Sequence, residues 1–249
     1  PDCLARLEHT LSDRVLLDNL QALSDPEDQA ALVSILAEAP PQRRFVLAGR
    51  AALPQYLKPF WVTGQLTLLG EADLALTPEQ TARALRQAGL TPDPVALVRV
   101  QEAFGGYPTA VSLLLARMGM GEAFGEVLLG AVRQDVYDCL DMGLFRLWGR
   151  RERQLLLCLA SFPRFSLGLA EAASDLDDAQ ALLARVLAGC SLLRAEAGGT
   201  CAWRPGAQDY LLHKQRQLCS REDIRWVHRR AGAYLEAAGD LIGALEHNQ

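Results

Sequence analysis

Arg14-Val15-Leu16-Leu17-Asp18-Asn19 and Arg44-Phe45-Val46-Leu47-Ala48-Gly49-Arg50 are two short apolar runs, each followed by polar or charged residues. Runs of this length, bounded by turn signals, are typical of strands buried on both faces of a sheet. Between them, residues 26–38 carry apolar side chains at helical spacing. The order strand, helix, strand is the unit of a parallel α/β sheet.

The residues that follow these two strands are the first candidates for a functional site. Ligands of parallel α/β sheets sit outside the carboxyl ends of the strands. We therefore expect Asp18 and Arg50 to share one edge of the sheet, one as an acid and the other as a base. The alternative is that Asp18 merely caps the next helix and that Arg50 is an ordinary surface residue.

The alternation of strands and helices ends near residue 70. Residues 64–70 resemble a third short strand, and Thr77-Pro78-Glu79-Gln80 then predicts a helix start with a capping box. Glycines separate the helices that follow. These helices are expected at about 78–88, 94–104, 108–117 and 122–131.

Residues 133–219 show the element order of a winged-helix domain. A hairpin across Gly198-Gly199 and a closing helix at 207–218 follow several helices, expected at 135–148, 150–160, 167–173 and 177–187. In a winged helix the recognition helix would be the one expected at 177–187. It is mostly apolar and acidic with one arginine, so we expect no direct nucleic-acid contact by this piece. Residues 220–249 resemble the first hairpin of a helical repeat array.

Composition describes an ordinary globular chain. Of the 249 residues, 50% are hydrophobic and 22% charged, and the net charge is −5. No apolar run reaches membrane-spanning length, and the six cysteines contain no Cys-x-x-Cys pair, so we expect no membrane contact, no zinc and a cytoplasmic location. The chain opens with Pro1-Asp2 before a helix expected at 2–12, and it closes within a helical pattern. We expect a fragment of a longer protein.

Taken in order, these segments resemble the central part of a MalT-type LuxR-family transcriptional regulator, a member of the STAND class of signal-transduction ATPases. Val15 to Leu20 resembles the Walker B strand, and Ala39 to Arg50 resembles the strand that ends in the sensor arginine. Leu66 to Gln80 resembles the entry to the helical lid, Phe104 to Ala110 the Gly-Trp-Pro motif, and Trp226 to His247 the start of the repeat domain.

The resemblance implies four parts and a mainly α fold with an α/β part. The four parts are a partial α/β nucleotide-binding domain (1–76), a helical lid (77–132), a winged helix (133–219) and a first repeat hairpin (220–249). It implies ATP or ADP with Mg²⁺ in the intact protein. Asp18 would hold Mg²⁺ through water, and Arg50 would sense the γ-phosphate. Pro108, with Tyr107 in place of the usual Trp, would pack against adenine.

Three departures from the family pattern limit this expectation. Asn19 stands at the second acid position and cannot accept a proton from water, so any ATPase activity should be slow. Arg204 stands near the place of a phosphate-reading histidine and could supply charge instead. No Gly-x-x-x-x-Gly-Lys-Ser/Thr loop occurs, so this piece alone should bind nucleotide weakly or not at all.

Two functions remain open from the sequence. The first is the ATP-dependent switch portion of a regulator. Its expected partners are its own phosphate-loop and DNA-binding segments outside this chain, a second copy of itself, and an inducer that the sequence does not identify. The alternative is a degenerate helical scaffold that has lost nucleotide binding. A hydrolase or transferase has little support, because the chain has neither a Gly-x-Ser-x-Gly elbow nor a plausible Cys-His pair.

Overall fold

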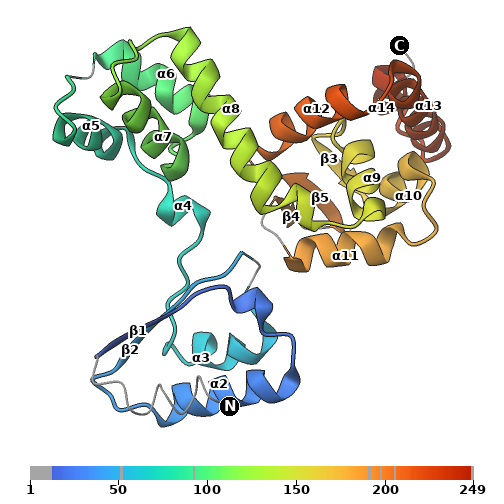
Figure 1. The fold of residues 1–249 in the computed structure, drawn as a ribbon. Helices are drawn as coiled ribbons and strands as arrows, with labels where there is room; N and C mark the ends of the chain where they lie inside the picture. Colours follow the sequence, from blue (N-terminus) through green and yellow to red (C-terminus); the bar gives the residue numbers. More distant parts are fainter. Residues whose placement is uncertain are drawn as a thin grey trace. The chain divides into compact units, whose positions relative to one another are not determined.

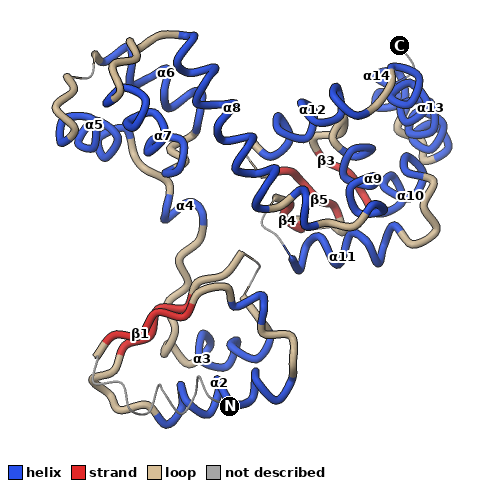
Figure 2. Tube along the Cα trace, in the orientation of Figure 1, coloured by secondary structure: helices blue, strands red, loops and turns tan. Residues whose placement is uncertain are grey.

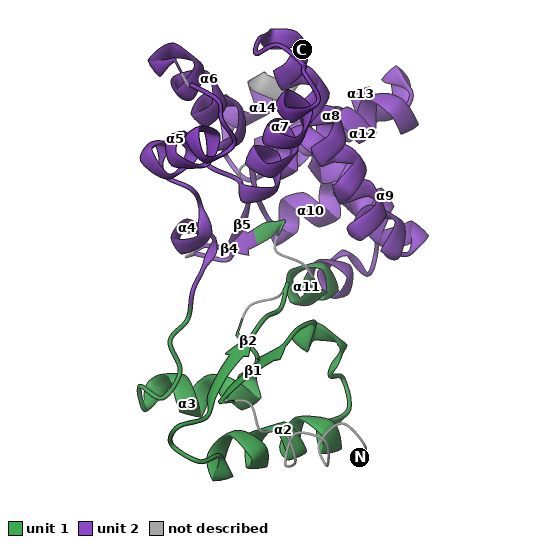
Figure 3. Ribbon diagram, turned by 60° about the vertical axis from the view of Figure 1, so that its left-hand side comes forward, with its two compact units in different colours: residues 1–68, 184–193 green, residues 69–183, 194–249 purple. Residues whose placement is uncertain are grey.

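The computed structural model describes residues 13–50, 53–91, 93–189, 192–196, 198–204 and 206–247. These residues are mostly helical, with two small sheets (Figures 1 and 2). They form two compact units, residues 1–68 with 184–193 and residues 69–183 with 194–249 (Figure 3). The helix expected at residues 2–12 lies outside the described part of the chain.

The predicted strand–helix–strand unit is confirmed. Strands β1 (Arg14–Leu17) and β2 (Arg44–Leu47) pair in parallel, with Arg14 opposite Arg44 and Leu17 opposite Leu47. Helix α2 (Pro26–Glu38) connects them. Its start is fixed by the Asp25 side chain, which accepts a hydrogen bond from the Glu27 N–H at 2.8 Å.

The prediction that both faces of these strands are buried is wrong for the described residues. Leu17 and Leu47 pack against the core of the first unit, whereas Leu16 is 68% exposed and Val46 is 57% exposed. Helix α2, the short helix η2 (Gln55–Leu57) and helix α3 (Lys58–Val62) supply the core on one side. An unbroken apolar run does not distinguish one covered face from two, because its residues are apolar on both.

The third strand predicted at residues 64–70 is also absent from the structure. Gly64, with φ of +73°, ends helix α3, and the Gln65 N–H returns to the Phe60 carbonyl at 2.9 Å. The following residues form no strand ladder within the described chain. Strand propensity alone was insufficient here, because a strand requires a paired neighbour.

The second unit begins with a series of helices. They are α4 (Glu71–Leu74), α5 (Pro78–Gln87), α6 (Pro94–Phe104), α7 (Pro108–Gly119) and α8 (Glu126–Gly143). The predicted capping box is present, since the Thr77 N–H donates to Gln80 Oε1 and the Gln80 N–H donates to Thr77 Oγ1.

The structure has one continuous helix, α8, where the sequence analysis predicted two helices at 122–131 and 135–148. It runs without a break through the expected domain boundary at 132/133. Val132 and Val136, four residues apart, both pack into the core of α6, α7 and α8. No glycine or proline interrupts the chain between them, so the helix continues.

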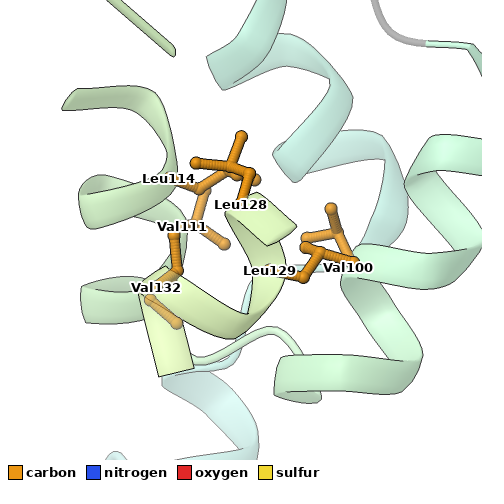
Figure 4. Packing of buried hydrophobic residues seen from close by; sticks show 7 residues of the cluster. Val100, Val111, Leu114, Leu128, Leu129 and Val132 are labelled. Carbon is orange, nitrogen blue, oxygen red and sulfur yellow. The ribbon is translucent and has the colours of Figure 1, made fainter. Parts of the chain in front are cut away.

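Buried aliphatic side chains join helices α6, α7 and α8 (Figure 4). The cluster consists of Val100, Ala110, Val111, Leu114, Leu128, Leu129 and Val132. At its margin the Arg117 guanidinium forms a two-pronged ion pair with Asp135, at 2.5 and 2.9 Å. This pairing lowers the pKa of the Asp135 carboxyl and ties α7 to α8.

The predicted hairpin is confirmed, and the structure adds a strand that the sequence did not indicate. Strands β3 (Arg164–Ser166), β4 (Leu193–Ala195) and β5 (Thr200–Trp203) form a sheet in the order β3-β5-β4. The accompanying helices are α9 (Arg150–Leu159), α10 (Leu167–Ser174), α11 (Ala179–Gly189) and α12 (Ala207–Leu218), with a short helix η3 (Phe145–Leu147) before them.

Helices α13 (Arg221–Ala237) and α14 (Leu241–His247) complete the described chain. They pack against each other across a turn at Gly239, whose φ is +82°. Arg230 attaches α13 to α10: its Nε donates to the Ala172 carbonyl at 2.7 Å, and its guanidinium pairs with Asp175. This helix pair agrees with the predicted helix, glycine turn and short helix.

Candidate functional site

The carboxyl ends of β1 and β2 lie side by side. The Ala48 N–H donates to the Leu17 carbonyl at 2.8 Å, and the Leu20 N–H donates to the Ala48 carbonyl at 3.1 Å. Since these bonds extend the parallel ladder by one residue, Asp18 and Arg50 follow the two strands at the same edge. Both residues thus follow the strands at the carboxyl edge of the sheet, which is where the sequence analysis expected each of them to lie.

Asp18 begins an exposed turn at this edge. One of its carboxylate oxygens accepts the Asn19 N–H at 2.6 Å. Asn19 has a φ of +63°, a left-handed conformation that asparagine tolerates better than most residues. The Asp18 side chain is accessible to solvent, which suits a carboxylate that would hold a hydrated cation.

The sequence analysis did not identify Gln21 as part of this edge. Its Nε2 donates to Asn19 Oδ1 at 3.0 Å, and its Oε1 accepts the Arg50 N–H at 3.2 Å. Gln21 thus links the turn after β1 to the turn after β2. Nothing in the local sequence signals this contact, because it depends on the register of two strands that are distant in sequence.

Tyr107 and Pro108 lie in the turn between α6 and α7, in the second unit. Gly105 ends α6 in the left-handed conformation, and Tyr107, 43% exposed, precedes Pro108 at the first position of α7. The Leu76 N–H donates to the Gly106 carbonyl at 2.8 Å. The turn is therefore attached to the segment that leads into α5.

Arg204 follows β5 and is already engaged with an acid. Its Nη1 lies 2.5 Å from Oε2 of Glu71, the first residue of α4. Its Nε is buried and has no hydrogen-bond partner within the described chain. A shallow hollow of about 260 Å³ adjoins it, lined by Arg194, Trp203, Arg204, Gly206, Gln208 and Asp209.

The five predicted site residues thus divide between the units. Asp18 and Arg50 belong to the first unit, and Tyr107, Pro108 and Arg204 belong to the second. Within the second unit, the segment from Glu71 to Leu76 contacts both Arg204 and the turn before Pro108. Sequence reasoning missed Glu71, which carries no motif of its own.

Metal-binding clusters are absent from the described residues. No group of three or more His, Cys, Asp or Glu side chains there is arranged to hold a metal ion. Among the same residues, no helix has the length and apolar character needed to cross a bilayer.

No protein-family model matches this sequence. No curated protein matches it either. Among solved structures, the chain is similar to a Signal Transduction ATPase with Numerous Domains (STAND) protein with a tetratricopeptide repeat sensor from Pyrococcus horikoshii. The two share 15% identity with a TM-score of 0.34, over 98% of this chain and 33% of the other. The chain therefore spans about one third of the length of that protein.

Proposed function

We propose that this chain is the switch portion of a STAND-class ATPase within a MalT-type LuxR-family regulator. The observation that carries the proposal is the parallel β1–α2–β2 unit, which presents Asp18 and Arg50 at one carboxyl edge. A carboxylate and a guanidinium at such an edge suit a magnesium nucleotide, which carries both a cation and terminal phosphate charge.

Each residue at this edge has a distinct role in the proposal. The exposed Asp18 carboxylate orients a hydrated Mg²⁺, because Mg²⁺ usually keeps several of its waters. Arg50 places positive charge at the γ-phosphate of ATP, so it distinguishes ATP from ADP. Asn19 accepts no proton from water, and the site therefore favours slow turnover and long-lived nucleotide states.

The second unit would supply the rest of the switch. Residues 77–132, which include α5, α6, α7 and the start of α8, would form the lid, and Tyr107 with Pro108 would pack against adenine. The order of the elements from α9 to α12 supports a winged helix, and α13 with α14 supports the start of a tetratricopeptide-like array. Arg204 would contact phosphate once it is released from Glu71.

In the intact protein, nucleotide would bias a closed state and an inducer on the repeats would bias an open, self-associating one. A separate segment would bind DNA. Both that segment and the phosphate loop of the nucleotide-binding domain would lie outside this chain. A cytoplasmic location follows from this role.

Calorimetry on the intact protein tests the proposal. Arg50→Ala should weaken ATP binding about tenfold or more, the loss expected for a charge-assisted contact, and should leave ADP binding nearly unchanged. Asp18→Asn should remove the Mg²⁺ dependence of ATP affinity. The control is Arg44→Ala, which removes an exposed arginine at the opposite end of β2. Equal ATP affinity in the Arg50 and Arg44 variants would refute the role of Arg50.

A second function, a scaffold without nucleotide, has one observation in its favour. Arg204 is neutralised by Glu71, so its charge is already balanced without a phosphate. This alternative predicts that neither ATP nor ADP gives a binding signal with the intact protein, and that all three variants behave alike.

A further inference from the structure

We propose that Gln21 is a positioning residue, which holds the turn carrying Arg50 against the turn carrying Asp18 and Asn19. The inference rests on the proposed nucleotide switch, because it assigns Gln21 a task within that site. It adds a residue that none of the sequence motifs identified.

The two ends of the Gln21 amide contact the two turns. Its oxygen accepts the Arg50 N–H at 3.2 Å, and its nitrogen donates to the Asn19 side-chain oxygen at 3.0 Å. A backbone N–H only donates, so the oxygen of the amide must face Arg50 and the nitrogen must face Asn19. One side chain therefore sets the separation of two turns that are 29 residues apart in sequence.

This contact extends the strand pairing beyond the sheet. The parallel ladder ends at Leu17 and Leu47. Ala48 then makes two more backbone hydrogen bonds to the turn after β1, one with the Leu17 carbonyl and one with the Leu20 N–H. Two residues after Ala48, the Arg50 N–H donates a further hydrogen bond to this turn, and its acceptor is the side-chain oxygen of Gln21. A Cβ added at Gly49 would make only ordinary van der Waals contacts, 3.4 Å from Leu20 Cβ and 3.5 Å from Gln21 Oε1, so the hydrogen bond from Arg50 to Gln21 does not depend on a glycine at this position.

The chemistry of Gln21 also makes a distinctive prediction about position 19. A neutral amide both donates and accepts, so Gln21 can bond to Asn19 or to an aspartate in its place. A glutamate at position 21 can still accept from Arg50 and from a flipped Asn19 amide. It cannot pair with an aspartate at position 19, because two carboxylates would repel each other.

The experiment combines ATP calorimetry on the intact protein with hydrogen exchange at the Arg50 amide. Gln21→Ala and Gln21→Met should each speed that exchange and weaken ATP binding by about three- to tenfold, as expected for the loss of one or two exposed hydrogen bonds. Gln21→Glu should restore both values in the Asn19 background and fail to do so together with Asn19→Asp. The control is Gln29→Ala, which removes a bond to the Leu23 carbonyl in the same unit.

The outcomes separate this inference from the proposed function. If Arg50→Ala weakens ATP binding but Gln21→Ala binds ATP like the wild type, Gln21 does not position the site and the inference is overturned. If Gln21→Ala leaves exchange at the Arg50 amide unchanged, the hydrogen bond itself is refuted, whatever the nucleotide does. If Arg50→Ala leaves ATP affinity unchanged, the proposed function fails and the positioning role falls with it.

Discussion

An added methyl group at Gly106 should displace the neighbouring backbone. Its φ is +77°, in the left-handed region that favours glycine. A Cβ placed there would collide with the Leu76 carbonyl oxygen and lie 3.0 Å from the Leu76 nitrogen. These are backbone atoms, so the segment before α5 would have to move away from the turn between α6 and α7.

The cost of Gly106→Ala follows from these contacts. The left-handed conformation costs an alanine about 1–2 kcal/mol. The displacement also breaks the hydrogen bond from the Leu76 N–H to the Gly106 carbonyl, which is worth about 1 kcal/mol. With some strain left in the shifted backbone, the free energy of unfolding of the second unit should fall by about 2–4 kcal/mol.

Gly105→Ala is the matched control, because the neighbouring glycine has a φ of +57° but a Cβ added to it would have no other atom within 4 Å. It should cost only the conformational term, about 1–2 kcal/mol. Urea unfolding followed by circular dichroism measures the free energy of unfolding of both variants. Hydrogen exchange at the Leu76 amide reports whether its hydrogen bond to the Gly106 carbonyl survives. Equal destabilisation, or unchanged exchange at Leu76 in Gly106→Ala, would refute the steric argument.

Two further predictions concern stability. Leu128→Ala should lower the free energy of unfolding, measured in urea, by about 2–5 kcal/mol, because Leu128 is buried in the core cluster. Val127→Ala, at an 89% exposed site on the same helix, should lower it by less than about 0.5 kcal/mol. Similar losses in the two variants would contradict this packing. The Asp141 carboxylate accepts hydrogen bonds from Lys214, Arg146 and Tyr210, and chiefly the Lys214 bond lowers its pKa. Asp141→Asn should therefore cost about 1–3 kcal/mol at pH 7. That difference should shrink as the pH falls below about 4, through the unfolded and then the lowered folded pKa; a constant difference down to pH 2 would argue against it.

The sequence by itself determined the features that depend on near neighbours. The apolar runs at residues 14–17 and 44–47 and the helix between them are confirmed. So are the helix start at Thr77 and the hairpin at Gly198-Gly199. These signals are local, because caps, left-handed glycines and apolar periodicity act within a few residues.

Only the tertiary structure decided which distant residues meet. It showed one covered face on β1 and β2 instead of two, a continuous α8, and no strand at 64–70 in the described chain. It also paired Gln21 with Arg50, 29 residues away, and Glu71 with Arg204, 133 residues away. Such pairings follow from strand register and helix packing, and a linear pattern of propensities contains neither.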